Sequence, residues 1–143
     1  MTEIDFYILG GDSIEARLVL ACRIAEKAVQ RECGVLIRPG SAAEARQLDE
    51  LLWTFSQGSF LPHRMASAAG PSPIEPVLID DGPGPVGERW DLLINLAGDV
   101  PEYFSRYARM AEVVDADADR RARGRERYRY YRDRGYSLKT HRV

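Results

Sequence analysis

Five short runs of apolar residues, most of them rich in β-branched side chains, are spaced along the chain between longer segments of mixed character. The runs lie at residues 4–9, 35–37, 77–79, 91–96 and 110–114. Strands this short and this apolar are typical of parallel sheets, in which both faces are buried. Their alternation with helical segments predicts an α/β fold, with a mostly parallel sheet and helices on both faces.

Two of the intervening segments carry helical patterns. One helix is predicted from a cap at Asp12 or Ser13 to about Gln30, and a second from Ala42 to about Trp53. Residues 54–76 show no period and contain several glycines and prolines, which predicts a long loop, and a short helix is expected from residue 101. A chain of 143 residues is expected to form one domain, residues 1–143.

The most distinctive stretch is residues 120–134, which contains eight arginines and three tyrosines. Residues 120–143 hold ten Lys or Arg against two acids, whereas residues 1–119 hold ten against twenty. We predict a basic helix at about residues 119–134 that closes the chain. The polarity of charge suggests a partner that is negatively charged where it meets this end.

Helical geometry gathers part of this stretch into a stripe. At 100° per residue, Arg121, Arg125, Tyr128 and Arg132 lie within about 60° of one another, and Arg129 flanks them. Like charges at this spacing repel, and an anion held by the guanidinium forks would remove that cost. Three interpretations stay open: a solvated helix with tyrosines packed on the sheet, nucleic-acid binding, or binding of an acidic peptide that ends in a free carboxylate.

Other chemistries have weak support in the sequence. The turn at residues 10–13, GGDS, lacks the spacing of a dinucleotide or phosphate loop and is predicted to be a turn and helix cap. His63 and His141, the latter expected near a frayed end, form no catalytic set, and the acids at 115, 117 and 119 are expected to cap a strand end and solvate a loop. We expect no enzyme activity, no cofactor and no metal. No apolar run approaches the roughly 20 residues that span a membrane, so a cytoplasmic location is expected.

Six segments resemble, in order, the chi subunit of bacterial DNA polymerase III, a clamp-loader accessory protein. They are FYIL at 6–9, RQLDELLW at 46–53, SFLPH at 59–63, DLLINL at 91–96, EVVD at 112–115 and RERYRYYRDRGY at 125–136. The resemblance covers nearly the whole chain. It implies a Rossmann-like fold without a nucleotide site and a non-catalytic linking role in the replisome.

In that family, chi joins the psi subunit of the clamp loader to the acidic C-terminal tail of single-stranded DNA-binding protein, and so reaches DNA indirectly. The resemblance places tail binding at Arg121, Arg125, Tyr128 and Arg129, to which the stripe adds Arg132. It places the psi surface, for which a helicase can compete, at Trp53, Phe60, Leu61, Pro62 and His63. One departure is the segment Ala116–Asp119, which is short and acidic where the family supplies an apolar wall. Direct binding of nucleic acid by the same basic helix is the alternative.

Overall fold

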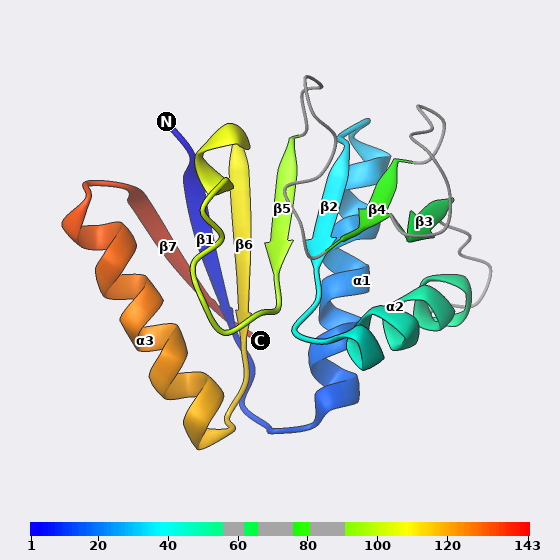
Figure 1. Ribbon diagram of the computed structural model, residues 1–143, viewed down its shortest axis with the longest axis horizontal. Coiled ribbons are helices and arrows are strands. Elements are labelled where there is room, and N and C mark those ends of the chain that lie inside the picture. The colour runs from blue at the N-terminus through cyan, green and yellow to red at the C-terminus, as the bar shows by residue number, and fades with distance from the viewer. Residues whose placement is uncertain (56–61, 66–75, 81–90) are drawn as a thin grey trace.

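A single parallel sheet organises the protein. The computed structural model describes residues 1–55, 62–65, 76–80 and 91–143, and within them the strand order is β3-β4-β2-β5-β6-β1-β7, with every pair parallel (Figure 1). The strands are β1 (Glu3–Ile8), β2 (Val35–Arg38), β3 (His63–Met65), β4 (Val77–Ile79), β5 (Leu92–Asn95), β6 (Arg109–Val114) and β7 (Ser137–Arg142). The helices are α1 (Ile14–Gln30), α2 (Ala42–Thr54) and α3 (Ala118–Asp133), with a 3-10 turn η1 (Phe104–Arg106). The predicted α/β fold is confirmed.

Helices cover both faces of the sheet, as the sequence predicted. Leu18 of α1 and Leu48 of α2 belong to one core cluster, together with Ile94 of β5. The neighbouring residue Leu93 points to the opposite face and joins the cluster that contains Tyr131 of α3. No helix within the described ranges is long and apolar enough to cross a membrane.

Serine residues fix the starts of α1 and α2. The Ser13 hydroxyl accepts a hydrogen bond from the Ala16 amide at 3.2 Å, and the Ser41 hydroxyl accepts one from the Glu44 amide at 3.1 Å. These bonds satisfy amides that have no partner inside the helix. The turn at residues 10–13 is therefore a helix cap, as expected.

Two strands were missed by the sequence prediction. β3 lies inside the segment 54–76 that was predicted to be a loop, and β7 follows the helix that was predicted to close the chain. β3 is only three residues long, and five of the six residues of β7 are exposed. Neither strand therefore carries the apolar pattern from which a buried strand is recognised.

Two smaller predictions were also wrong. The helix expected from residue 101 is only the 3-10 turn η1. His141 is not in a frayed end but in β7, where its ring stacks on Tyr7 with centroids 4.8 Å apart and its Nε2 lies 2.9 Å from the Asp5 carboxylate. β7 is thus held against β1 by the contacts of His141 as well as by main-chain hydrogen bonds between the two strands.

One row of paired residues crosses the sheet on the face that α3 covers. The register places side by side Arg38 of β2, Asn95 of β5, Glu112 of β6, Phe6 of β1 and Thr140 of β7. The row is polar from Arg38 to Glu112 and becomes aromatic at Phe6 of β1. It ends at β7, the edge strand of the sheet.

Candidate functional site

The short acidic segment before α3 builds the start of that helix. The Asp117 carboxylate accepts a hydrogen bond from the Arg120 amide at 3.0 Å and caps the helix, and Asp119 lies in its first turn. Both positions suit acids, because the amino end of a helix carries partial positive charge. Asp115 was expected to help solvate a loop, but it is buried.

Asp115 and Arg120 form a two-pronged ion pair at the rim of the sheet. The Arg120 Nε and one terminal nitrogen donate to the two Asp115 oxygens at 2.9 and 2.7 Å. Burial acts to raise the pKa of Asp115, but the hydrogen bonds and charge of Arg120 outweigh burial and hold that pKa below its ordinary value. The pair ties the first turn of α3 to the end of β6.

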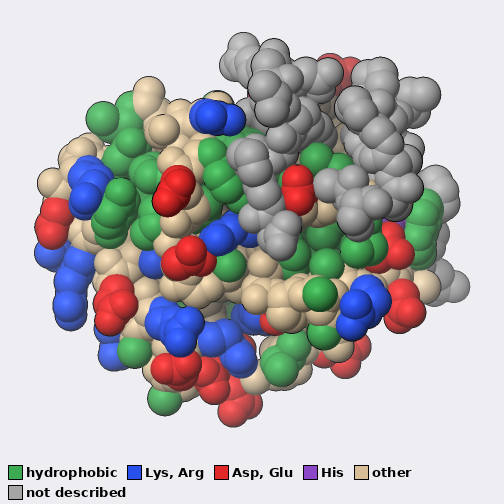
Figure 2. All heavy atoms as spheres, in the orientation of Figure 1, with side chains coloured by type: hydrophobic (Ala, Val, Ile, Leu, Met, Phe, Trp, Pro, Cys, Tyr) green, Lys and Arg blue, Asp and Glu red, His purple; other side chains and the backbone are tan. Residues whose placement is uncertain are grey.

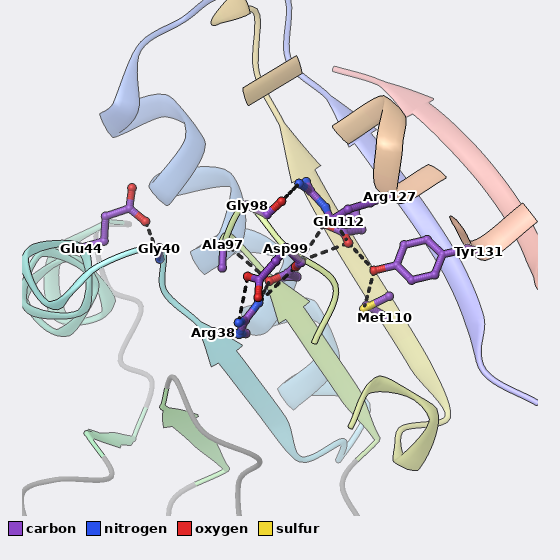
Figure 3. A network of polar contacts seen from close by, with 11 residues as sticks. Arg38, Gly40, Glu44, Ala97, Gly98, Asp99, Met110, Glu112, Arg127 and Tyr131 are labelled. Carbon is purple, nitrogen blue, oxygen red and sulfur yellow. Dashed lines mark hydrogen bonds and ion pairs between the residues drawn. The ribbon is translucent and has the colours of Figure 1, made fainter. Parts of the chain in front are cut away.

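A second buried carboxylate anchors the middle of α3 (Figure 3). The Glu112 side chain accepts hydrogen bonds from Arg127 Nε at 3.0 Å and from the Tyr131 hydroxyl at 2.6 Å, both on α3. Asn95 of β5 donates to the same carboxylate at 3.0 Å, and another Arg127 nitrogen donates to the Gly98 carbonyl at 2.9 Å. Burial raises the pKa of Glu112 above its ordinary value, against the opposing effect of Arg127 and the hydrogen bonds.

Gly124 lets α3 approach the sheet closely. A Cβ atom at this position would lie 3.0 and 3.1 Å from the two methyl carbons of Val114, closer than carbon atoms normally approach. The buried side of α3 therefore consists of Gly124, Arg127 and Tyr131, and none of these is an aliphatic residue.

The predicted stripe lies on a different side of α3. Tyr128 is half-buried, and its ring meets the edge of the Phe6 ring with centroids 5.2 Å apart. Arg121 donates to the Leu9 carbonyl at 3.2 Å, so this side of the helix faces β1 and β7. Arg123, on the opposite side, lies against Gly98. Lys and Arg side chains gather along the side of the molecule that α3 forms, at the left of Figure 2.

The exposed arginines of the stripe, unlike Arg127 on the buried side of α3, lack a buried carboxylate as partner in the described part of the chain. Arg125 and Arg129 are exposed, and no ion pair involves either of them among the described residues. Arg132 has only the carboxylate of its neighbour Asp133, at 3.4 Å. The stripe thus presents guanidinium groups that the described part of the fold does not use.

The second predicted surface lies at the other end of the sheet. Trp53 of α2 is 42% exposed, and its ring lies over His63 of β3 with centroids 4.2 Å apart. The buried His63 holds the Asp49 carbonyl and carboxylate oxygens at 2.9 and 3.0 Å through Nε2. Pro62 is exposed, whereas Phe60 and Leu61 lie outside the described residues.

In the described ranges, no group of three or more His, Cys, Asp or Glu side chains is arranged so that it could hold a metal ion. The arginine at the start of α1, Arg17, is buried and is bound to Glu44 and to the Leu96 carbonyl. The ion pair between Arg17 and Glu44 thus joins α1 to α2 beside the carboxyl end of β5.

A sequence profile of the DNA polymerase III chi subunit family, HolC, matches residues 1–139 of the chain. The chain belongs to this family. DNA polymerase III subunit chi of Pseudomonas aeruginosa is 36% identical to it over 143 residues, which are all of this chain and 98% of that protein. The chi subunit of Haemophilus influenzae is 32% identical over 140 residues, or 96% and 95% of the two chains. That of Escherichia coli is 31% identical over 144 residues, or 98% and 97%.

All three relatives are bacterial and are named as a subunit of DNA polymerase III, which places the chi family in DNA replication. For this chi-family chain, the sequence analysis predicted the stripe of α3. It did not predict the buried contacts of Glu112 with Arg127 and Tyr131 that hold α3 to the sheet. One signal was available: Glu112 is an acid inside the otherwise apolar run 110–114 of β6. A charged group at such a position needs a buried partner, and Arg127 is that partner.

Proposed function

We propose that the chain is a non-catalytic adaptor of the bacterial replisome. In this proposal α3 binds the acidic C-terminal tail of single-stranded DNA-binding protein, and the surface around Trp53 binds the psi subunit of the clamp loader or a competing helicase. DNA is then reached only through the tail-bearing protein. The observation that carries the proposal is the exposure of Arg125 and Arg129, without ion-pair partners among the described residues, on a helix whose inner arginines are paired.

The chemistry of the stripe suits a peptide that ends in a carboxylate. A guanidinium group binds a carboxylate through two parallel hydrogen bonds, and further arginines attract acids that precede it. Tyr128 and Leu138 pack on the same core cluster and are only partly buried, so they offer apolar surface beside the arginines. In this proposal Tyr128 and Leu138 contact the apolar side chain of the last tail residue. The segment 116–119 does not contact that side chain.

Calorimetry with a synthetic copy of the tail tests this site. We expect binding to weaken about tenfold or more when the terminal carboxylate is converted to an amide, because a charge-assisted hydrogen-bonded pair is lost. Arg125→Ala should weaken binding to a similar degree. The matched control is Arg123→Ala, which removes the same charge from the opposite side of α3 and should leave affinity within about twofold. Equal effects of the two substitutions, or none, would show that the stripe is not the receptor.

The surface around Trp53 has its own test. Trp53 is 42% exposed, and aromatic side chains of this kind supply large contact area at protein interfaces. Trp53→Ala should weaken binding of the purified psi subunit about thirtyfold, from the loss of about 2 kcal/mol. Gln47→Ala, exposed on the same helix, should have no effect. If both variants bind psi like the wild type, the partner surface lies elsewhere.

Direct binding of nucleic acid is the second candidate. One observation favours it: the partly exposed ring of Tyr130 lies beneath Arg134, whose guanidinium carbon is 3.4 Å from the ring centroid. Such pairs can stack on bases. Against it, the Tyr128 ring is engaged with Phe6 and is not free to stack. Tight binding to an oligonucleotide, with a steep loss of affinity as salt rises, would support this candidate.

A further inference from the structure

Among the described strands, none pairs with the outer edge of β7 at any point along its length. β7 pairs with β1 in an unbroken register from Ser137 to Arg142, and among the described strands nothing pairs with its other side. The opposite edge strand, β3, is only three residues long. A six-residue edge without proline or bulge is a ready template for one more strand.

The ladder shows which residues face outward. The Val143 amide donates to the Ile8 carbonyl at 3.0 Å, so the main-chain groups of Val143 point toward β1. In a strand these directions alternate from one residue to the next. The amides and carbonyls of Leu138, Thr140 and Arg142 therefore point away from the sheet.

The charges on β7 select what this edge can accept. Lys139 and Arg142 lie on it, and no acidic residue occurs between Arg134 and Val143. A second copy of β7 would meet like charges, which protects the edge from pairing with itself. An acidic segment would meet opposite charges at the same positions.

Basic groups flank the edge on both faces of the sheet. The register places Thr140 and Arg142 on the face of Phe6 and Ile8, which α3 and its stripe cover. Lys139 and His141 lie on the other face, beside Asp5 and Tyr7. A strand added at this edge would therefore have cationic side chains above and below it.

We propose that the outer edge of β7 binds an extended acidic peptide as an additional strand. The proposal rests on the proposed function: the added strand is the acidic segment that precedes the terminal carboxylate held by the α3 stripe. α3 then recognises the end of the peptide, and β7 binds its main chain. Main-chain pairing gives affinity with little dependence on the order of the acidic side chains.

Thr140 supplies a test with a matched pair of variants. Thr140→Pro removes one outward amide and leaves the ladder with β1 intact, because proline is accepted on edge strands where the amide faces solvent. Thr140→Val keeps that amide and nearly the same side-chain shape. Neither substitution replaces a residue of the stripe. Calorimetry is run with two ligands: a long acidic peptide with a free carboxylate, and a short one that holds only the terminal apolar residue and its carboxylate.

We expect the long peptide to bind the wild type at least about tenfold more tightly than the short one, and Thr140→Pro to weaken the long peptide about fivefold. Thr140→Val should bind both peptides like the wild type, and the short peptide should not distinguish the variants. In a second measurement, N-methylation of the long peptide should weaken binding to the wild type at every second position only. This measurement does not depend on how well Thr140→Pro folds.

The outcomes separate this proposal from the proposed function. Equal affinity of Thr140→Pro and Thr140→Val for the long peptide, with no alternating effect of N-methylation, would overturn strand addition while tail binding by α3 stands. If neither peptide binds the wild type, both proposals are overturned. An alternating pattern together with loss of affinity in Thr140→Pro alone would establish β7 as the strand-binding edge.

Discussion

Both the inner and the outer side of α3 carry arginines, but the inner arginines are paired with buried carboxylates and the outer ones are exposed. On the inner side, Arg127 is buried and bound to Glu112, and Arg120 is bound to the buried Asp115. On the outer side, Arg125 and Arg129 are exposed and have no ion-pair partner among the described residues. The inner arginines hold the helix to the sheet, and we propose that the outer ones bind a ligand.

This difference shows that the number of arginines alone does not define a binding surface. A guanidinium group that is already neutralised by a buried carboxylate has no capacity left for a second anion, whereas an exposed one retains it. The two sides should therefore respond to substitution in opposite ways. Inner substitutions should cost stability, and outer ones should cost binding.

The largest expected effect is at Glu112. Glu112→Ala leaves Arg127 buried without its carboxylate and should lower the free energy of unfolding by about 3–5 kcal/mol. Urea denaturation followed by circular dichroism measures the change. Arg123→Ala on the exposed side serves as the control and should change stability by less than about 0.5 kcal/mol. A small effect of Glu112→Ala would remove the distinction between the two sides of the helix.

An intermediate effect is expected at Asp115, and it depends on pH. The pKa of Asp115 is lowered in the folded state, so its ionised form stabilises the fold above its unfolded pKa of about 3.9. This contribution is lost as the pH falls through the folded value. At neutral pH, Asp115→Asn should be less stable than the wild type by about 1 kcal/mol.

The gap between the wild type and Asp115→Asn should close as the pH is lowered from about 4. Unfolding midpoints measured at a series of pH values follow this closure. A gap that stays constant across the acid range would mean that the pair with Arg120 does not contribute through its charge.

The smallest expected effect on stability is at Arg125. Arg121, Arg125 and Arg129 follow one another at i, i+4 along α3, and like charges at this spacing repel. Arg125→Gln should therefore raise the free energy of unfolding by about 0.3 kcal/mol per pair at low salt. Salt should reduce this gain, because it screens the repulsion. A clear loss of stability would show that Arg125 has a structural partner.

Much of the fold follows from local sequence signals. The serines at 13 and 41 mark the starts of α1 and α2, and the apolar runs mark five of the strands. β7 has no such signal, because an edge strand exposed on both faces needs no apolar residues. Its existence depends on pairing with β1, which is more than 130 residues away in sequence.

The candidate site was predictable only in part. The period of the helix placed Arg121, Arg125, Tyr128 and Arg132 on one side of α3 from sequence alone. The helical period does not show which side of α3 packs on the sheet, because the buried residues Gly124, Arg127 and Tyr131 form no aliphatic stripe. The pairing of Arg127 with Glu112 requires the register of β6 beneath the helix, and this register is a property of the whole sheet.

The place of β1 also has a consequence for protein synthesis. β1 leaves the ribosome before the other described strands, yet its two neighbours, β6 and β7, lie within residues 109–142. A growing chain therefore keeps β1, an interior strand of the sheet, unpaired until those residues have been made. Chains interrupted before β7 have no completed basic edge to offer. If β7 binds a peptide as proposed, a growing chain gains this site only after residues 137–142 have been made.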